Sequence, residues 1–115
     1  MADDLHDLMV EARRLSSLID AGVDALRRSA VDVADAEHAY RKAKAEAWLQ
    51  VAGWDGLAGQ KQAEVDSACA DARRVRDVAE ATRQAALEAL RSRRSQLDAL
   101  RSILSVSKSE MELAR

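Results

Sequence analysis

The sequence predicts an all-α fold: a long, coiled-coil-like antiparallel two-helix hairpin that assembles into a four-helix bundle. Three observations lead to this prediction. The 115-residue chain has no proline and only four glycines, so little in it interrupts a helix. Three of those glycines lie within residues 53–59, which indicates one turn. Apolar residues recur at heptad spacing on both sides of that turn.

The first expected helix runs from about residue 3 to residue 52, because apolar or small residues fill two heptad positions throughout it. One position holds Leu5, Ala12, Ile19, Leu26, Val33, Tyr40 and Ala47, and the other holds Leu8, Leu15, Gly22, Ser29, Ala36 and Ala43.

The turn is expected at 53–59 and the second helix at about 60–113, so residues 1–115 form a single helical-hairpin domain. The core positions of the second helix are Val65, Ala72, Ala79, Ala86, Arg93, Leu100 and Ser107 in one set, and Cys69, Arg76, Arg83, Leu90, Leu97, Leu104 and Met111 in the other.

Folding the two helices back at Gly56 pairs positions whose numbers sum to 112. Large residues then meet small ones, as where Gly22 faces Leu90. The first forty residues carry nine acids and four bases, whereas 73–101 carry eight arginines and four acids. In this register we expect Arg73 near Glu37 and Arg91 near Asp20.

A second apolar stripe flanks the expected seam, and a lone hairpin leaves it in water. We therefore expect a homo-oligomer. The candidate self-association residues are Met9, Leu18, Val23, Leu87 and Ile103.

Both tryptophans of the chain lie within seven residues of each other, at the end of the first helix and in the turn, which indicates a protein-binding tip, because tryptophan is enriched at binding hot spots. The alternative is that the indoles only close the end of the hairpin over the seam. The candidate tip residues are Trp48, Leu49, Val51, Trp54 and Leu57.

Arginines along the second helix form a candidate nucleic-acid face, since basic residues repeated along a helix can follow a phosphate backbone. The alternative is that interleaved acids and the acidic first helix neutralise them. The residues of this face are Arg73, Arg74, Arg91, Arg94 and Arg101.

No pattern of residues indicates catalysis, a metal site or a cofactor. His6 and His38 each follow an aspartate by three residues, but they lie about 48 Å apart along one helix and on its outward face. Cys69 is the only cysteine, so no disulfide forms within the chain. The start of the chain lacks a signal-peptide pattern, and no apolar run is long enough to span a membrane. We therefore expect a non-enzymatic protein in the cytoplasm, without a membrane partner.

Two stretches resemble a group of small uncharacterised helical proteins, mycobacteriophage-like early-gene products encoded by bacteriophages of actinobacteria. They are residues 37–49, EHAYRKAKAEAWL, and residues 85–97, AALEALRSRRSQL. The resemblance implies a protein of the infected bacterial cytoplasm, so the partner expected at the tip is a phage or host protein. It also implies an alternative, an accessory role in phage DNA recombination or replication.

Trp54, Asp55 and Gly56 between two helices also resemble the W-x-G helical hairpins exported by type VII secretion. That resemblance implies a secreted protein as a second alternative. The export signal of that family, a tyrosine followed four residues later by an acid near the C-terminus, is missing, since Tyr40 is the only tyrosine.

Overall fold

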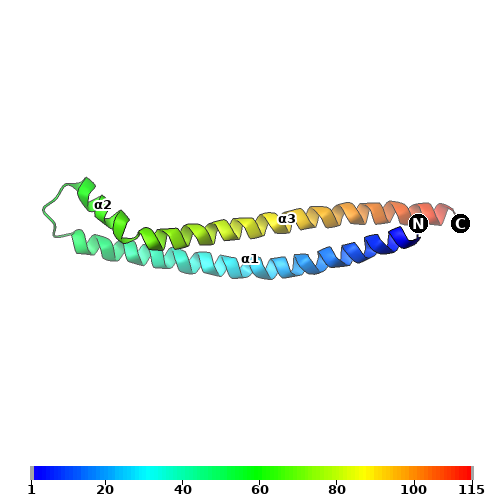
Figure 1. The fold of residues 1–115 in the computed structure, drawn as a ribbon, viewed down its shortest axis with the longest axis horizontal. Helices are drawn as coiled ribbons and strands as arrows, with labels where there is room; N and C mark the ends of the chain where they lie inside the picture. The colour runs from blue at the N-terminus through cyan, green and yellow to red at the C-terminus, as the bar shows by residue number, and fades with distance from the viewer. Residues whose placement is uncertain (1, 115) are drawn as a thin grey trace. The chain divides into compact units, whose positions relative to one another are not determined.

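A computed structural model describes residues 2–114, and every regular element within that range is a helix. Helix α1 spans Ala2–Val51, α2 spans Ala58–Ala68 and α3 spans Ala70–Leu113, as labelled in Figure 1. The predicted all-α class is confirmed. It follows from a sequence rich in good helix formers and free of proline.

Helix α1 ends one residue before its predicted limit. The backbone N–H of Trp54 donates to the carbonyl oxygen of Val51 at 3.0 Å, which closes the last turn of the helix. Residues 52–57 then form the non-helical connection.

The glycines of the connection act through low helix propensity rather than through special backbone angles. No glycine among the described residues has a positive φ. The backbone N–H of Gln60 donates to the carbonyl oxygen of Leu57 at 3.0 Å, and α2 begins between them at Ala58. Gly59, which was expected in the turn, therefore lies in α2.

The second predicted helix is interrupted at Cys69, which separates α2 from α3 and has φ −106° and ψ 13°. The carbonyl oxygen of Val65 accepts two hydrogen bonds there, from the backbone N–H of Cys69 at 3.1 Å and from its Sγ at 2.9 Å. Serine and threonine side chains that bond back to a carbonyl four residues earlier often bend helices, and the Cys69 thiol makes the same kind of hydrogen bond. The expectation of one unbroken helix over 60–113 is therefore corrected to two helices.

The chain divides into two compact units. Unit 1 contains the described residues of Met1–Leu26 and Ala85–Arg115, and unit 2 is Arg27–Gln84. Each unit therefore combines a stretch of α1 with a stretch from beyond the connection.

The core of unit 1 is leucine-rich. Leu15, Leu90 and Leu97 are buried in it. A Cβ atom built on Gly22 would lie 3.3 Å from Cδ1 of Leu90, so these two residues face each other as the register of 112 predicts.

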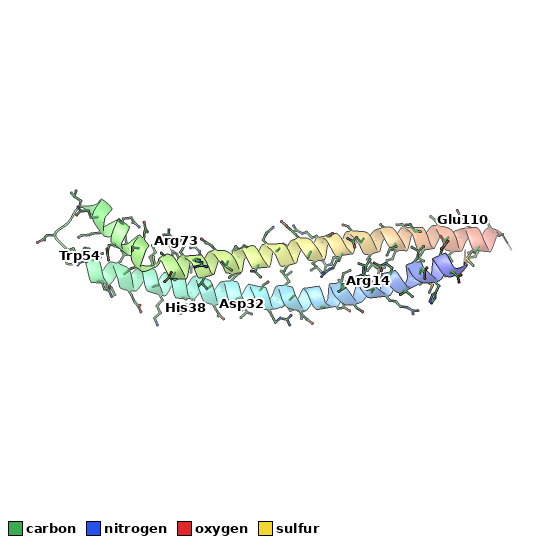
Figure 2. All side chains as sticks on the ribbon, in the orientation of Figure 1. Arg14, Asp32, His38, Trp54, Arg73 and Glu110 are labelled. Carbon is green, nitrogen blue, oxygen red and sulfur yellow. The ribbon has the colours of Figure 1, made fainter. Side chains whose placement is uncertain are left out.

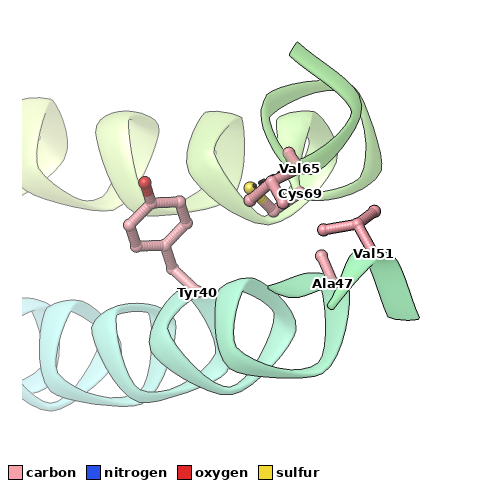
Figure 3. Packing of buried hydrophobic residues seen from close by; sticks show 5 residues of the cluster. All are labelled: Tyr40, Ala47, Val51, Val65 and Cys69. Atoms are coloured by element: carbon pink, nitrogen blue, oxygen red, sulfur yellow. Dashed lines mark hydrogen bonds between the residues drawn. The ribbon is translucent and has the colours of Figure 1, made fainter. Parts of the chain in front are cut away.

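The core of unit 2 is a cluster of small and medium-sized side chains with one tyrosine at its end, seen in Figure 3. Ala43 and Ala72 pack against this cluster. Its buried members are Tyr40, Ala47, Val51, Val65 and Cys69.

Burial follows the predicted heptad closely. Every predicted core position over 5–47 is buried or half-buried, and so is every one over 65–107. The exception is Met111, which is exposed near the end of α3. The spacing of apolar residues therefore identifies which face of each helix is covered.

Candidate functional sites

The tip of unit 2 exposes four of its five predicted residues. Trp54 is 49% exposed and Trp48 is 37% exposed, while Leu49 and Leu57 are 76% and 74% exposed. Trp54 lies in the connection after α1, as Figure 2 shows. Hydrogen bonds at Val51 and Leu57 hold the backbone on both sides of this connection.

Val51 was expected in the tip but is only 2% exposed, so that assignment is wrong. It follows the buried Ala47 by one helical turn and therefore continues the covered face of α1. In the core cluster Val51 joins Val65, which is fully buried. Both valines are buried members of the cluster, whereas neither tryptophan belongs to it.

Charged side chains surround Tyr40 in unit 2, an arrangement that the sequence analysis missed. The guanidinium carbon of Arg76 lies 4.2 Å from the ring centroid of Tyr40, and that of Arg73 lies 5.9 Å from it. The Nζ atom of Lys44 lies 6.0 Å from the same centroid. Cations over an aromatic face are attracted to its quadrupole. The register of 112 could have predicted these contacts, because it pairs Tyr40 with Ala72, and Arg73 and Arg76 follow Ala72 within about one helical turn.

The ion pairs of unit 2 differ from the predicted ones. Arg73 pairs with Asp66 at 3.2 Å, across the break between α2 and α3, rather than with Glu37. Arg76 approaches Glu37 instead, at 3.9 Å, and also pairs with Asp77 at 3.1 Å. Asp66 precedes Cys69 by three residues and Arg73 follows it by four, so this pair spans the interruption between α2 and α3.

These contacts set the direction of two arginine pKa shifts. Contact with the Tyr40 side chain raises the pKa of Arg73 above its ordinary value, and Asp66 adds to the shift. A hydrogen bond to Asp77 raises the pKa of Arg76, and Glu37 adds to that shift. Both side chains therefore remain cationic, which suits a structural role in unit 2.

The predicted self-association residues all lie in unit 1, and they differ in exposure. Met9 and Ile103 are exposed, whereas Leu18, Val23 and Leu87 are half-buried. Met9 lines an apolar groove at the start of α1 and the end of α3. Its full lining is Leu5, Met9, Leu104, Lys108, Met111 and Glu112.

The five candidate nucleic-acid residues are divided between the units. Arg73 and Arg74 belong to unit 2, and Arg91, Arg94 and Arg101 belong to unit 1. Within residues 2–114 only Arg73 of the five forms an ion pair, and the expected pair between Arg91 and Asp20 is absent. Arg94 and Arg101 instead border a shallow groove that also contains Asp20.

No protein-family model, curated protein or solved structure matches this chain. The resemblances to phage proteins and to W-x-G hairpins therefore stay predictions.

The remaining titratable candidates are dispersed. His6 and His38 are both exposed, and the described residues contain no group of three or more histidine, cysteine, aspartate or glutamate side chains able to hold a metal ion. The thiol of Cys69 is buried and bonded to the Val65 carbonyl. None of the helices within residues 2–114 is long and apolar enough to cross a membrane.

Proposed function

We propose that this chain is a non-enzymatic protein–protein interaction module, which acts in the cytoplasm of a phage-infected bacterium and binds its partner through the tip. The tip is here defined as Trp48, Leu49, Trp54 and Leu57. One observation carries the proposal: Val51 and Val65 close the core of unit 2, while both tryptophans stay in contact with water. Neither indole is a member of the buried cluster, and both keep surface available to a partner.

The composition around the tip suits a binding surface. Exposed aromatic and aliphatic side chains form its centre, and polar residues such as Gln50, Asp55 and Gln60 surround it. Binding hot spots have this arrangement, in which apolar anchors are ringed by polar groups that exclude water when a partner docks. A protein partner is thus the occupant that the chemistry favours.

We also infer that the whole chain is an antiparallel hairpin that self-associates toward a four-helix bundle. Contacts in each unit support the hairpin. Gly22 meets Leu90 in unit 1, and Glu37 meets Arg76 in unit 2. Higher residue numbers in α1 therefore face lower residue numbers in α3, as in an antiparallel pair. Exposed Met9 and Ile103 in unit 1 support self-association.

The experiment is quantitative capture of binding proteins from an actinobacterial host, with and without phage infection. Trp54→Ala is expected to lose the captured protein while helicity by circular dichroism stays unchanged. Val31→Ala is the matched control, because Val31 is also an exposed apolar residue of unit 2 but lies far along α1 from the tip. Capture that depends on His6 and His38 instead of Trp54 would contradict the proposal.

A second candidate function is contact with nucleic acid, favoured by the arginines without ion pairs in the described range, Arg74, Arg91, Arg94 and Arg101. Such a contact weakens steeply with salt, since bound arginines release counterions from the phosphates. Fluorescence anisotropy with duplex DNA at 50 and 200 mM salt tests it. Salt-dependent binding that Arg94→Gln with Arg101→Gln weakens supports the accessory role in DNA metabolism.

A further inference from the structure

Unit 1 has a lateral side that we call the arginine side. Arg94, Arg101 and Lys108 follow one another at seven-residue steps on α3, so they form one stripe. Two grooves run along this stripe. The first places Arg94 and Arg101 beside Asp20 of α1, and the second places Lys108 beside Met9.

The acidic side lies on the opposite flank of the same helices. Asp4 shares a groove with Glu110, and Glu110 shares another with Ile103 and Val106. Glu110 lies two residues beyond Lys108, and Ile103 two beyond Arg101. Two residues correspond to about 200° around a helix, which puts these side chains on opposite flanks of α3.

Apolar side chains are exposed on both sides rather than in one stripe. Met9 is exposed on the arginine side, and Ile103 and Val106 on the acidic side. Leu18 follows Asp4 by two heptads and so belongs to the acidic side, whereas Val23 follows Met9 by two heptads and belongs to the arginine side. One closed dimer that uses a single side therefore leaves the apolar residues of the other side in water.

The charges of the two sides decide how they pair. Both charged residues that line the grooves of the acidic side are carboxylates, Asp4 and Glu110. The grooves of the arginine side hold its three cations and three acids, Asp20, Asp98 and Glu112. Arg13 and Arg91 precede Asp20 and Asp98 by one heptad and so lie on the same side, where cations therefore outnumber acids. Among the ion pairs within residues 2–114, none involves a charged residue of these grooves. Two acidic sides repel each other, whereas an acidic side and an arginine side attract.

We propose that copies of this chain associate heterologously, with the acidic side of unit 1 in one copy docked on the arginine side of unit 1 in the next. This contact brings the carboxylates of Asp4 and Glu110 to the cations of Arg101 and Lys108, and it covers exposed apolar residues on both sides. Each copy then has two different neighbours, and the assembly grows beyond a dimer or closes as a ring. Each pair of docked copies contributes four helices, so the inference rests on the proposed self-association and extends it from one four-helix bundle to a larger assembly. It does not depend on the tip, which belongs to unit 2.

The test uses two purified charge-reversal variants of the full chain, without any partner. One reverses the arginine side, Arg101→Glu with Lys108→Glu, and the other reverses the acidic side, Asp4→Lys with Glu110→Lys. Sedimentation velocity over 10–300 μM is expected to give species larger than dimers for the wild type. Such species form in this range when the dissociation constant of each contact is about micromolar to millimolar. Each variant alone is expected to associate at least tenfold more weakly, because both of its sides then carry the same sign.

Mixing the two variants is the decisive step, since opposite signs then meet at every contact. Association is expected to return in the mixture to within about threefold of the wild-type level. Matched reversals in unit 2, Lys42→Glu with Arg74→Glu and Asp32→Lys with Asp35→Lys, are expected to leave association unchanged. Circular dichroism of every variant checks that the helices persist.

Other outcomes overturn the proposal. A wild-type chain that stays monomeric at 300 μM contradicts it directly. A variant with a reversed acidic side that still dimerises indicates a symmetric contact through the arginine side, and the converse result indicates one through the acidic side. Assembly that occurs only after duplex DNA is added assigns the arginines to a polyanion instead. Each of these results leaves the tip proposal untouched, because the Trp54 experiment measures capture of another protein.

Discussion

Gly22 of α1 faces Leu90 of α3, and a Cβ atom at residue 22 would lie 3.3 Å from the leucine Cδ1. The contact fixes the register of unit 1. It also leaves almost no room at residue 22, because Leu90 is itself buried.

Substitutions at Gly22 should therefore separate helix propensity from packing. Gly22→Ala raises helix propensity by up to about 1 kcal/mol. The tight contact between the new Cβ atom and Leu90 cancels part of this gain. Gly22→Leu overpacks the seam and is expected to lower the free energy of unfolding by about 1–3 kcal/mol. Thermal or urea melts measure both. Equal stability of the two variants would show that residue 22 does not face Leu90.

Val65 is expected to stabilise unit 2 far more than either tryptophan of the tip. It is fully buried, so Val65→Ala removes two carbon atoms from the core and leaves a cavity, at a cost of about 2 kcal/mol. Trp54→Ala removes a half-exposed side chain outside the cluster and should change unfolding free energy by less than about 0.5 kcal/mol. Urea denaturation compares them. A larger loss for Trp54→Ala means that the indole is part of the core.

Arg76 should be coupled energetically to Tyr40. Its guanidinium lies 4.2 Å from the ring centroid and its side chain is only 28% exposed, so we expect a coupling free energy of about 0.5–1 kcal/mol. A double-mutant cycle with Tyr40→Leu and Arg76→Gln isolates this coupling from the effect of each change alone. Because Tyr40→Phe retains the ring, it should retain most of the coupling. A coupling free energy of zero between Tyr40 and Arg76 would rule out the cation–π contact.

Glu11 should titrate at lower pH than an ordinary glutamate. A hydrogen bond from Arg14 lowers the pKa of Glu11 below 4.5, and the two side chains pair across one helical turn. The stabilisation from this pair is present above the ordinary pKa and is lost as the pH falls through the lowered one. Carbon-detected NMR titration measures the pKa of Glu11 directly. In Arg14→Gln the pKa of Glu11 should rise toward the ordinary glutamate value, and an unchanged pKa would refute the pairing.

The heptad predicted the core well because burial on a helix depends on spacing, which the sequence contains. Leu15 and Leu97 are buried at the positions that the seven-residue repeat assigns to them. The end of α1 was predicted to within one residue, since three glycines lower helix propensity just beyond it.

The bend at Cys69 was not predictable in this way. The residues on both sides of it favour helix, and the hydrogen bond from the Cys69 thiol to the Val65 carbonyl at the interruption is not visible in the heptad spacing. Arg73 pairs with Asp66 across this interruption, whereas the register of two unbroken helices placed Arg73 near Glu37.

The candidate sites were predictable as residue types but not as surfaces. Trp54 and Leu57 could be assigned to the tip from their place in the turn. The burial of Val51 depends on its contact with residues beyond the turn, which sequence spacing alone did not reveal. Met9 and Ile103 were predicted as one stripe, yet they lie on grooves that contain different residues of unit 1.

The measurement that tests the central claim most directly is the dissociation constant of the captured partner for wild type and for Trp54→Ala. Loss of one hot-spot tryptophan removes about 2 kcal/mol of binding free energy, which raises the dissociation constant about thirtyfold. We predict that increase, with unchanged helicity and with Val31→Ala equal to wild type. A partner that binds Trp54→Ala and wild type with the same dissociation constant would contradict the account, because the tip would then not be the binding surface.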